Sequence, residues 1–253
     1  MKPVVAVVGK GGVGKTTVTA LLGTALAARG HRVLVVDADP ASGLGLSVGL
    51  SPRRTLDDLR RELIAQVESG LATDATDMLA TADYRLMQTL QERGSLALLG
   101  VGRPEEEGCY CKLNGFLRQA IEALSDQFAV TLIDAEAGVE QVNRRVMRSV
   151  SHLLLVCDLS RKALRVAESI HQVAVRSCST TMQAGLVVNR ARDHILREPH
   201  LPATSLPLWG TIREDDNVVQ FDMQGRPLHE MPPDSPAVTD MDPLVQRVLE
   251  LLR

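Results

Sequence analysis

Short apolar runs alternate with amphipathic helical patterns along most of the chain. The runs are continuous rather than alternating, as expected for strands that are covered on both faces. They span residues 4–8, 32–36, 96–99, 129–133, 153–156, 184–188 and 206–212. Helical patterns between them include residues 16–28, 114–124, 139–150 and 163–176. The alternation predicts an α/β fold, a doubly wound and mostly parallel sheet with helices on both faces and a ligand site at the carboxyl ends of its strands.

Two stretches depart from this rhythm. Residues 52–93 predict two helices, at 56–69 and 78–93, which form a helical insertion between the second and third strands. A lid, a partner surface and additional packing all remain open as its role. The pattern at 242–253 places its leucines and valines on one helical face, which predicts a helix docked on the core. Because no internal repeat is present, we expect a single domain over residues 1–253.

A glycine-rich segment follows the first apolar run directly. Residues 9–17 fit the pattern G-x-x-x-x-G-K-[ST], with Gly9, Gly14, Lys15 and Thr16 in its fixed places. The glycines let successive backbone N–H groups point at one anion, and the following helix adds its positive N-terminal dipole. Lys15 can reach the β- and γ-phosphates, and the Thr16 hydroxyl can ligate Mg²⁺. The segment therefore predicts binding of a nucleoside triphosphate. The other loop residues expected to contact the nucleotide are Gly11, Gly12, Val13 and Thr17.

Carboxylates follow two further apolar runs. Asp37 and Asp39 come after residues 32–36, and Asp134 ends the stretch after residues 129–133. One carboxylate near Mg²⁺ can hold a metal-bound water, while another can orient the water that attacks the γ-phosphate. A simple Asp-Pro turn is the alternative at residues 37–40. We expect Asp37 and Asp134 to serve the Mg²⁺ site, and the Gly138 N–H to sense the γ-phosphate.

Composition narrows the possible partners. The net charge is −3 and aromatic residues make up 2% of the chain, so neither a basic field nor stacking platforms favour nucleic acid. No apolar run approaches the roughly 20 residues of a membrane span. The first apolar run leads directly into the glycine-rich loop, which leaves no room for a signal peptide. We therefore expect a cytoplasmic protein with neither a nucleic-acid partner nor a membrane span.

The loop Lys10-Gly-Gly-Val-Gly-Lys15-Thr-Thr resembles the deviant Walker A motif of the MinD/ParA/nitrogenase-iron-protein class of dimerising P-loop ATPases. The resemblance implies that Lys10 reaches the nucleotide of a partner subunit, so that ATP closes a homodimer and hydrolysis reopens it. It also implies that Asp39 orients the attacking water and that Asn189 reads adenine. A turn asparagine is the alternative for Asn189 on chemistry alone.

Cys109 and Cys111 stand out among the four cysteines. A disulfide within Cys-x-Cys is strained, whereas two thiolates are soft ligands for zinc, nickel or copper(I). Two thiolates fill half of a four-coordinate shell, and the dimer implied by the loop would supply the other half. Spacing alone also fits two incidental loop cysteines. We expect Cys157 and Cys178 to be small buried residues rather than ligands.

The segments Arg103-Pro-Glu-Glu-Glu-Gly-Cys109-Tyr-Cys111 and Asp134-Ala-Glu136-Ala-Gly138 resemble the CooC-type nickel-insertion ATPases. This resemblance implies a metallochaperone that delivers Ni²⁺ or Zn²⁺ to carbon monoxide dehydrogenase or a related nickel enzyme. Ala38 departs from the glycine common in that group. A MinD/ParA-like positioning ATPase remains an alternative. An iron–sulfur reductase resembling the nitrogenase iron protein is a second, although residues 134–148 lack the cysteine it would need.

Overall fold

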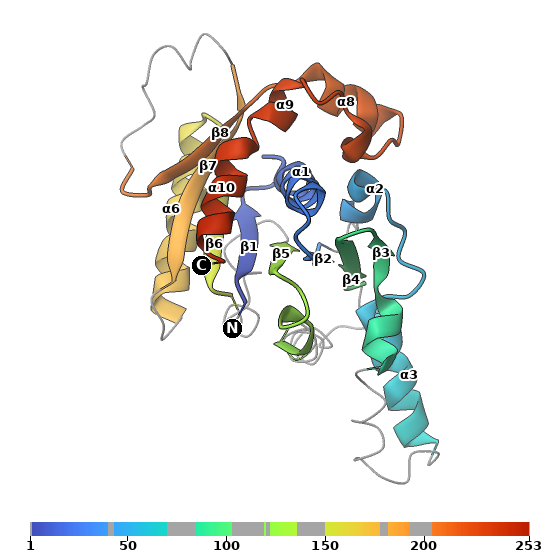
Figure 1. Ribbon diagram of the computed structural model, residues 1–253. Helices are drawn as coiled ribbons and strands as arrows, with labels where there is room; N and C mark the ends of the chain where they lie inside the picture. The colour runs from blue at the N-terminus through green and yellow to red at the C-terminus, as the bar shows by residue number, and fades with distance from the viewer. Residues whose placement is uncertain are drawn as a thin grey trace.

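The computed structural model describes residues 2–39, 43–69, 84–102, 119, 122–135, 150–177, 182–192 and 204–252. Within these residues, eight strands form one sheet in the order β3-β4-β2-β5-β1-β6-β7-β8 (Figure 1). Their bounds are β1 Val4–Gly9, β2 Val33–Asp37, β3 Gln91–Arg93, β4 Leu96–Gly100, β5 Val130–Asp134, β6 His152–Cys157, β7 Gln183–Ala191 and β8 Leu208–Arg213. Neighbouring strands pair in parallel, and β3 and β4 are the antiparallel pair. The predicted fold class is confirmed.

Helices cover the sheet on both sides. Their bounds are α1 Lys15–Ala28, α2 Leu44–Val48, α3 Leu56–Glu68, α6 Arg161–Ser177, α8 Asp216–Met223, the 3₁₀ turn η2 Leu228–Glu230, α9 Pro236–Thr239 and α10 Asp242–Glu250. The crossover through α1 runs from β1 towards β2, and that through α6 runs from β6 towards β7, in opposite directions along the sheet. Right-handed connections therefore place α1 and α6 on opposite faces.

The order of the strands reverses around β1, which lies between β5 and β6. Every residue of β1, β2, β4 and β5 is buried, which explains why these segments read as continuous apolar runs. A reversal of this kind opens a crevice at the carboxyl ends of the central strands, where ligands bind in sheets of this type. The glycine-rich loop leaves β1 at that edge.

The prediction of a helix over residues 78–93 is wrong at its end. Residues 84–89 are helical, but Gln91–Arg93 forms β3 and pairs with β4 across a turn in which Gly94 has φ 57°. The three residues of β3 are polar and lie at the sheet edge, so no apolar pattern marks them. Their pairing depends on the left-handed turn at Gly94, which glycine adopts without strain.

The other expected elements agree within three residues at each end where they are described. β8 begins at Leu208, two residues later than expected. Most of the expected helix at 114–124 lies outside the described residues, although 122–125 are helical. The expected helix at 139–150 also lies outside them, except for Val150, which is not helical.

Helices α3 and α10 behave as the sequence predicts. A capping box starts α3, because Asp58 N donates to Thr55 Oγ1 over 3.2 Å while Thr55 N donates to Asp58 Oδ2 over 2.9 Å. Helix α10 docks through Leu244, Val245 and Val248, which are at most 1% exposed. Among the described helices, none is long and apolar enough to cross a membrane.

Candidate nucleotide site

Two of the loop glycines are required by close packing. A Cβ atom on Gly9 would lie 2.2 Å from the carbonyl oxygen of Val156, and one on Gly14 would lie 2.3 Å from Nδ2 of Asn189. Gly14 also has φ 89°, in the left-handed region that favours glycine. Gly12 has φ 81°, but a Cβ there would meet no atom of the described residues within 4 Å. The loop therefore needs glycine for space at its two ends and for conformation at its centre.

Helix α1 begins at Lys15, directly after the loop. Gly14 precedes it without a side-chain cap, and its first turn carries no acidic residue. The N–H groups of that turn therefore face the loop without an acidic side chain from the turn itself, as suits a phosphate site. Lys15 is 7% exposed, so its charge is held inside the site. The structure places Lys15 and Thr16 in the first turn of this helix.

Asp37 and Asp134 end adjacent strands and are partners in the pairing of β2 with β5. Parallel strands bring their carboxyl ends to one edge, so residues far apart in the chain meet beside the loop. Oδ2 of Asp37 accepts a hydrogen bond from Leu44 N over 3.1 Å. Among the described residues, Oδ1 of Asp37 and both carboxylate oxygens of Asp134 have no hydrogen bond of regular geometry, and all three atoms are buried.

The environment of the two acids disfavours their charged forms. Burial raises the pKa of Asp134 to about 7; the charge of Asp37 also raises it, while the Thr16 hydroxyl and the charge of Lys15 oppose the rise. Burial likewise raises the pKa of Asp37 to about 6, against the hydrogen bond from Leu44 N. Two buried carboxylates beside a phosphate loop, with a threonine hydroxyl next to one of them, fit a hydrated divalent cation. Asp37, Asp134 and Thr16 would hold Mg²⁺, which supplies charge neutralisation for the phosphates when bound.

Asp39 lies two residues beyond Asp37, and its charge raises the pKa of both Asp37 and Asp134. Lys10 lies at the start of the loop near Asp158 of the segment after β6. Burial disfavours ionisation of Asp158, but hydrogen bonds from Ser160 and the charges of Lys10 and Arg190 outweigh it, and the pKa of Asp158 is lowered. The structure thus places Asp39 close to the acidic pair, Asp37 and Asp134. Lys10 lies instead on the side of the loop that faces Asp158.

The end of β7 contacts the loop directly. Asn189 is 4% exposed, and its Nδ2 donates to the Val13 carbonyl over 2.8 Å. Nη1 of Arg190 donates to the Gly12 carbonyl over 3.1 Å. Sequence reasoning did not single out Arg190. Beside these residues lies a cavity of about 260 Å³, which Thr17, Asn189, Arg190 and Ala237 help to line. A second cavity of about 480 Å³ shares Thr17 and Arg190 with it.

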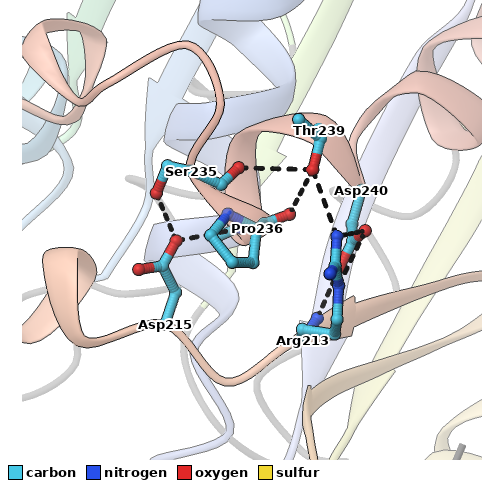
Figure 2. Close-up of polar contacts among 7 residues, drawn as sticks. Arg213, Asp215, Ser235, Pro236, Thr239 and Asp240 are labelled. Carbon is cyan, nitrogen blue, oxygen red and sulfur yellow. Dashed lines mark hydrogen bonds and ion pairs between the residues drawn. The ribbon is translucent and has the colours of Figure 1, made fainter. Parts of the chain in front are cut away.

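The buried carboxylate of Asp215, which is among the residues that line the smaller cavity, has several hydrogen-bond partners. Figure 2 shows its contacts with the segment that leads into α9. Oδ1 of Asp215 accepts from Asn217 N over 2.9 Å and so caps α8. Its Oδ2 accepts from the Ser235 hydroxyl, and from Ala237 N over 3.0 Å at the start of α9. Arg213 joins the other end of α9, because its Nε and Nη2 each donate to the Asp240 carboxylate over 2.8 Å.

The sequence analysis did not include Asp215. An aspartate directly before a helical pattern is a recognisable N-cap signal, but nothing in the sequence indicates its partner at Ser235.

Several expected residues lie outside the described part of the chain, namely Gly138, Cys109, Cys111 and Cys178. Cys157 is 1% exposed, as expected, and burial raises the pKa of its thiol to about 12. Metal binding needs the thiolate form, which a raised pKa disfavours. Cys157 is therefore a buried core residue rather than a metal ligand. Over the described ranges, no group of three or more His, Cys, Asp or Glu residues is arranged to hold a metal ion.

A glycine-rich loop between β1 and α1, with buried carboxylates at the ends of two adjacent parallel strands, defines a nucleotide-binding protein of the P-loop class. Residues 4–228 match the sequence profile of the CobQ/CobB/MinD/ParA nucleotide binding domain, and the chain belongs to this family of ATPases.

Two relatives match nearly the whole length of the chain. An uncharacterized ATP-binding protein of Methanocaldococcus jannaschii is 31% identical over 97% of this chain and 98% of its own. The carbon monoxide dehydrogenase accessory protein CooC of Rhodospirillum rubrum is 26% identical over 96% of this chain and 97% of its own.

Two solved structures share the fold. The cell division ATPase MinD of Pyrococcus furiosus has a TM-score of 0.73 and 25% identity, and the match covers 99% of this chain and 100% of that one. MinD of Pyrococcus horikoshii, solved with Mg-ADP, has a TM-score of 0.73 and 23% identity, over 99% of this chain and 97% of that one.

Proposed function

We propose that this ATPase is a metal-delivery protein that closes as a homodimer on ATP. Cys109 and Cys111 of two subunits would together bind one Ni²⁺ or Zn²⁺ ion, and hydrolysis would release it to a client. The client in this proposal is carbon monoxide dehydrogenase or a related nickel enzyme in the cytoplasm. A ligand that binds only the dimer stabilises the dimer, so metal and ATP would favour the same closed state.

One structural observation carries this proposal. The segment that contains the two cysteines follows Gly102, directly after β4, and β4 ends beside the acidic pair. Gly100 is the pairing partner of Asp37, and Val101 N donates to the Asp37 carbonyl over 3.0 Å. The cysteine segment therefore starts from backbone that is hydrogen-bonded to a residue of the expected Mg²⁺ site. In this proposal, a change at the phosphates would reach the start of the cysteine segment through this backbone contact.

Within the nucleotide site, we assign roles that follow the class. Lys15 would neutralise the β- and γ-phosphates, Asp39 would orient the attacking water, and the Gly138 N–H would report the γ-phosphate. Lys10 would act on the nucleotide of the partner subunit. Asn189 would read the base from the 260 Å³ cavity that it lines.

A second candidate is a positioning ATPase of the MinD kind, which the similarity to Pyrococcus MinD supports. That function would leave Cys109 and Cys111 without a role. The similarity to CooC over nearly the full chain supports metal delivery instead. Ion binding by the cysteine pair therefore separates the two candidates.

The test combines metal titration, elemental analysis and sedimentation, each with and without ATP. We expect one ion per dimer for the wild type, and no bound ion for the double variant Cys109→Ala, Cys111→Ala, with ATP hydrolysis retained. Cys157→Ala is the matched control, because it removes a buried thiol with a raised pKa and should leave metal binding intact. Unchanged metal stoichiometry in the double variant would refute the metal site. ATP-dependent dimerisation of the wild type without any bound ion would favour the positioning function.

A further inference from the structure

Arg190 holds a backbone conformation that is costly for its residue type. Its φ is 56°. Among the described residues other than glycine, Arg190 alone has a positive φ. The pairing of β7 with β8 changes register between Val188 and Ala191, so Arg190 sits in a bulge. Left-handed backbone strains residues that carry a Cβ atom, and such strain persists where the surrounding structure enforces it, often at functional sites.

The bulge has a definite geometric effect. Consecutive side chains of a regular strand point to opposite faces of the sheet. Here the consecutive residues Asn189 and Arg190 both reach the phosphate loop, and they donate to the neighbouring carbonyls of Val13 and Gly12. The left-handed residue breaks the alternation and brings the second side chain to the same loop.

We propose that Arg190 is a positioning residue for the phosphate loop, and that its strained backbone is retained because it places the guanidinium on the Gly12 carbonyl. Carbonyls held from outside the loop leave its N–H groups directed at the bound phosphates. Arg190 also lines both cavities, the one beside Asn189 and the one beside Thr16. It therefore lies at the junction between the proposed base cavity and the phosphate site. The inference rests on binding of ATP by this loop.

The test uses two substitutions that separate the side chain from the backbone. Arg190→Ala removes the guanidinium and keeps the left-handed strain, whereas Arg190→Gly removes both. The matched control is Arg192→Ala. It removes a nearby cation that pairs with Glu214 over 3.1 Å and is 65% exposed. Isothermal titration with Mg-ATP gives the affinity, and thermal melting gives the stability.

We expect both Arg190 variants to bind ATP about five- to tenfold more weakly than the wild type, as for the loss of one solvent-exposed hydrogen bond of ordinary strength. We also expect Arg190→Gly to melt at a higher temperature than Arg190→Ala, because glycine relieves the strain. If Arg190 had a purely structural role, ATP affinity would follow stability. Weak ATP binding by Arg190→Gly, in spite of a melting temperature above that of Arg190→Ala, would not fit that role.

ATP affinities of both Arg190 variants equal to that of Arg192→Ala would overturn the positioning role. A lower melting temperature for Arg190→Gly than for Arg190→Ala would overturn the strain argument. If the wild type itself failed to bind ATP, the nucleotide site would be wrong rather than the role of Arg190. The three results are therefore distinguishable.

Discussion

The hydrogen bonds of Asp215 make a quantitative prediction about stability. Asp215→Asn preserves the size of the side chain and one acceptor oxygen, which can still cap α8, since asparagine is a good N-cap residue. The amide nitrogen would replace Oδ2, which accepts from both Ser235 and Ala237 N. An amide nitrogen cannot accept the Ala237 N–H, so a buried donor is left without a partner. We expect the free energy of unfolding to fall by about 2–3 kcal/mol at neutral pH.

The predicted loss depends on pH in a definite direction. Burial disfavours ionisation of Asp215, but the hydrogen bonds from Ser235, Ala237 N and Asn217 N outweigh it, so its pKa lies below the ordinary value of 3.8. A carboxylate with a lowered pKa contributes stability that is complete above its unfolded pKa and is lost as the pH falls through its folded pKa. The difference between wild type and Asp215→Asn should therefore be full at pH 7 and shrink below about pH 4.

Urea denaturation at pH 7 and at a series of lower pH values measures both quantities. The matched control is Asp216→Asn, an exposed acid in the first turn of the same helix. It alters the interaction with the helix dipole alone, for which we expect a loss of about 0.5 kcal/mol. If Asp215→Asn cost no more than Asp216→Asn at pH 7, or if the difference grew on acidification, the reasoning would be refuted.

Two further predictions concern the loop. Lys10→Ala should still bind ATP, but in sedimentation it should fail to dimerise with a slowly hydrolysed ATP analogue. The control Lys162→Ala, at an exposed lysine, should dimerise normally. Normal dimerisation of Lys10→Ala would exclude action of Lys10 across the interface. Gly14→Ala should weaken ATP binding far more than Gly12→Ala in titration calorimetry. Both positions have positive φ, but a Cβ on Gly14 alone would collide with Asn189, so equal losses would show that conformation rather than space decides.

The sequence predicts those features that depend on apolar periodicity and on strand ends. The central strands read as continuous apolar runs because both of their faces are covered. Asp37 and Asp134 could be expected to meet, since residues at the carboxyl ends of adjacent parallel strands share one edge. β3 could not be predicted, because its three polar residues become a strand only through the turn at Gly94 and pairing with β4.

The missed residues of the site have a common physical reason. Arg190 reaches the loop through a bulge, and the bulge is a property of the pairing between β7 and β8 rather than of the local sequence. Asp215 is a visible N-cap, but its second role depends on Ser235, twenty residues further along the chain. Local patterns specify each element, whereas these contacts depend on how separate elements meet.

Asp37 connects the expected Mg²⁺ site to α2 and to the start of the cysteine segment. Its carboxylate accepts from Leu44 N at the start of α2, its carbonyl accepts from Val101 N, and its strand partner is Asp134. α2, the start of the cysteine segment and the expected Mg²⁺ site therefore share one residue. A cation that drew the Asp37 carboxylate towards the phosphates would stretch the bond to Leu44 N, and α2 would have to follow or lose it. The backbone bond to Val101 does not involve the carboxylate, so it would carry movement of the strand end itself. A change in the conformation of the cysteine segment on nucleotide binding should accordingly require a shift of the end of β2. Hydrogen exchange of the Val101 backbone amide, measured with and without Mg-ATP, would detect such a shift.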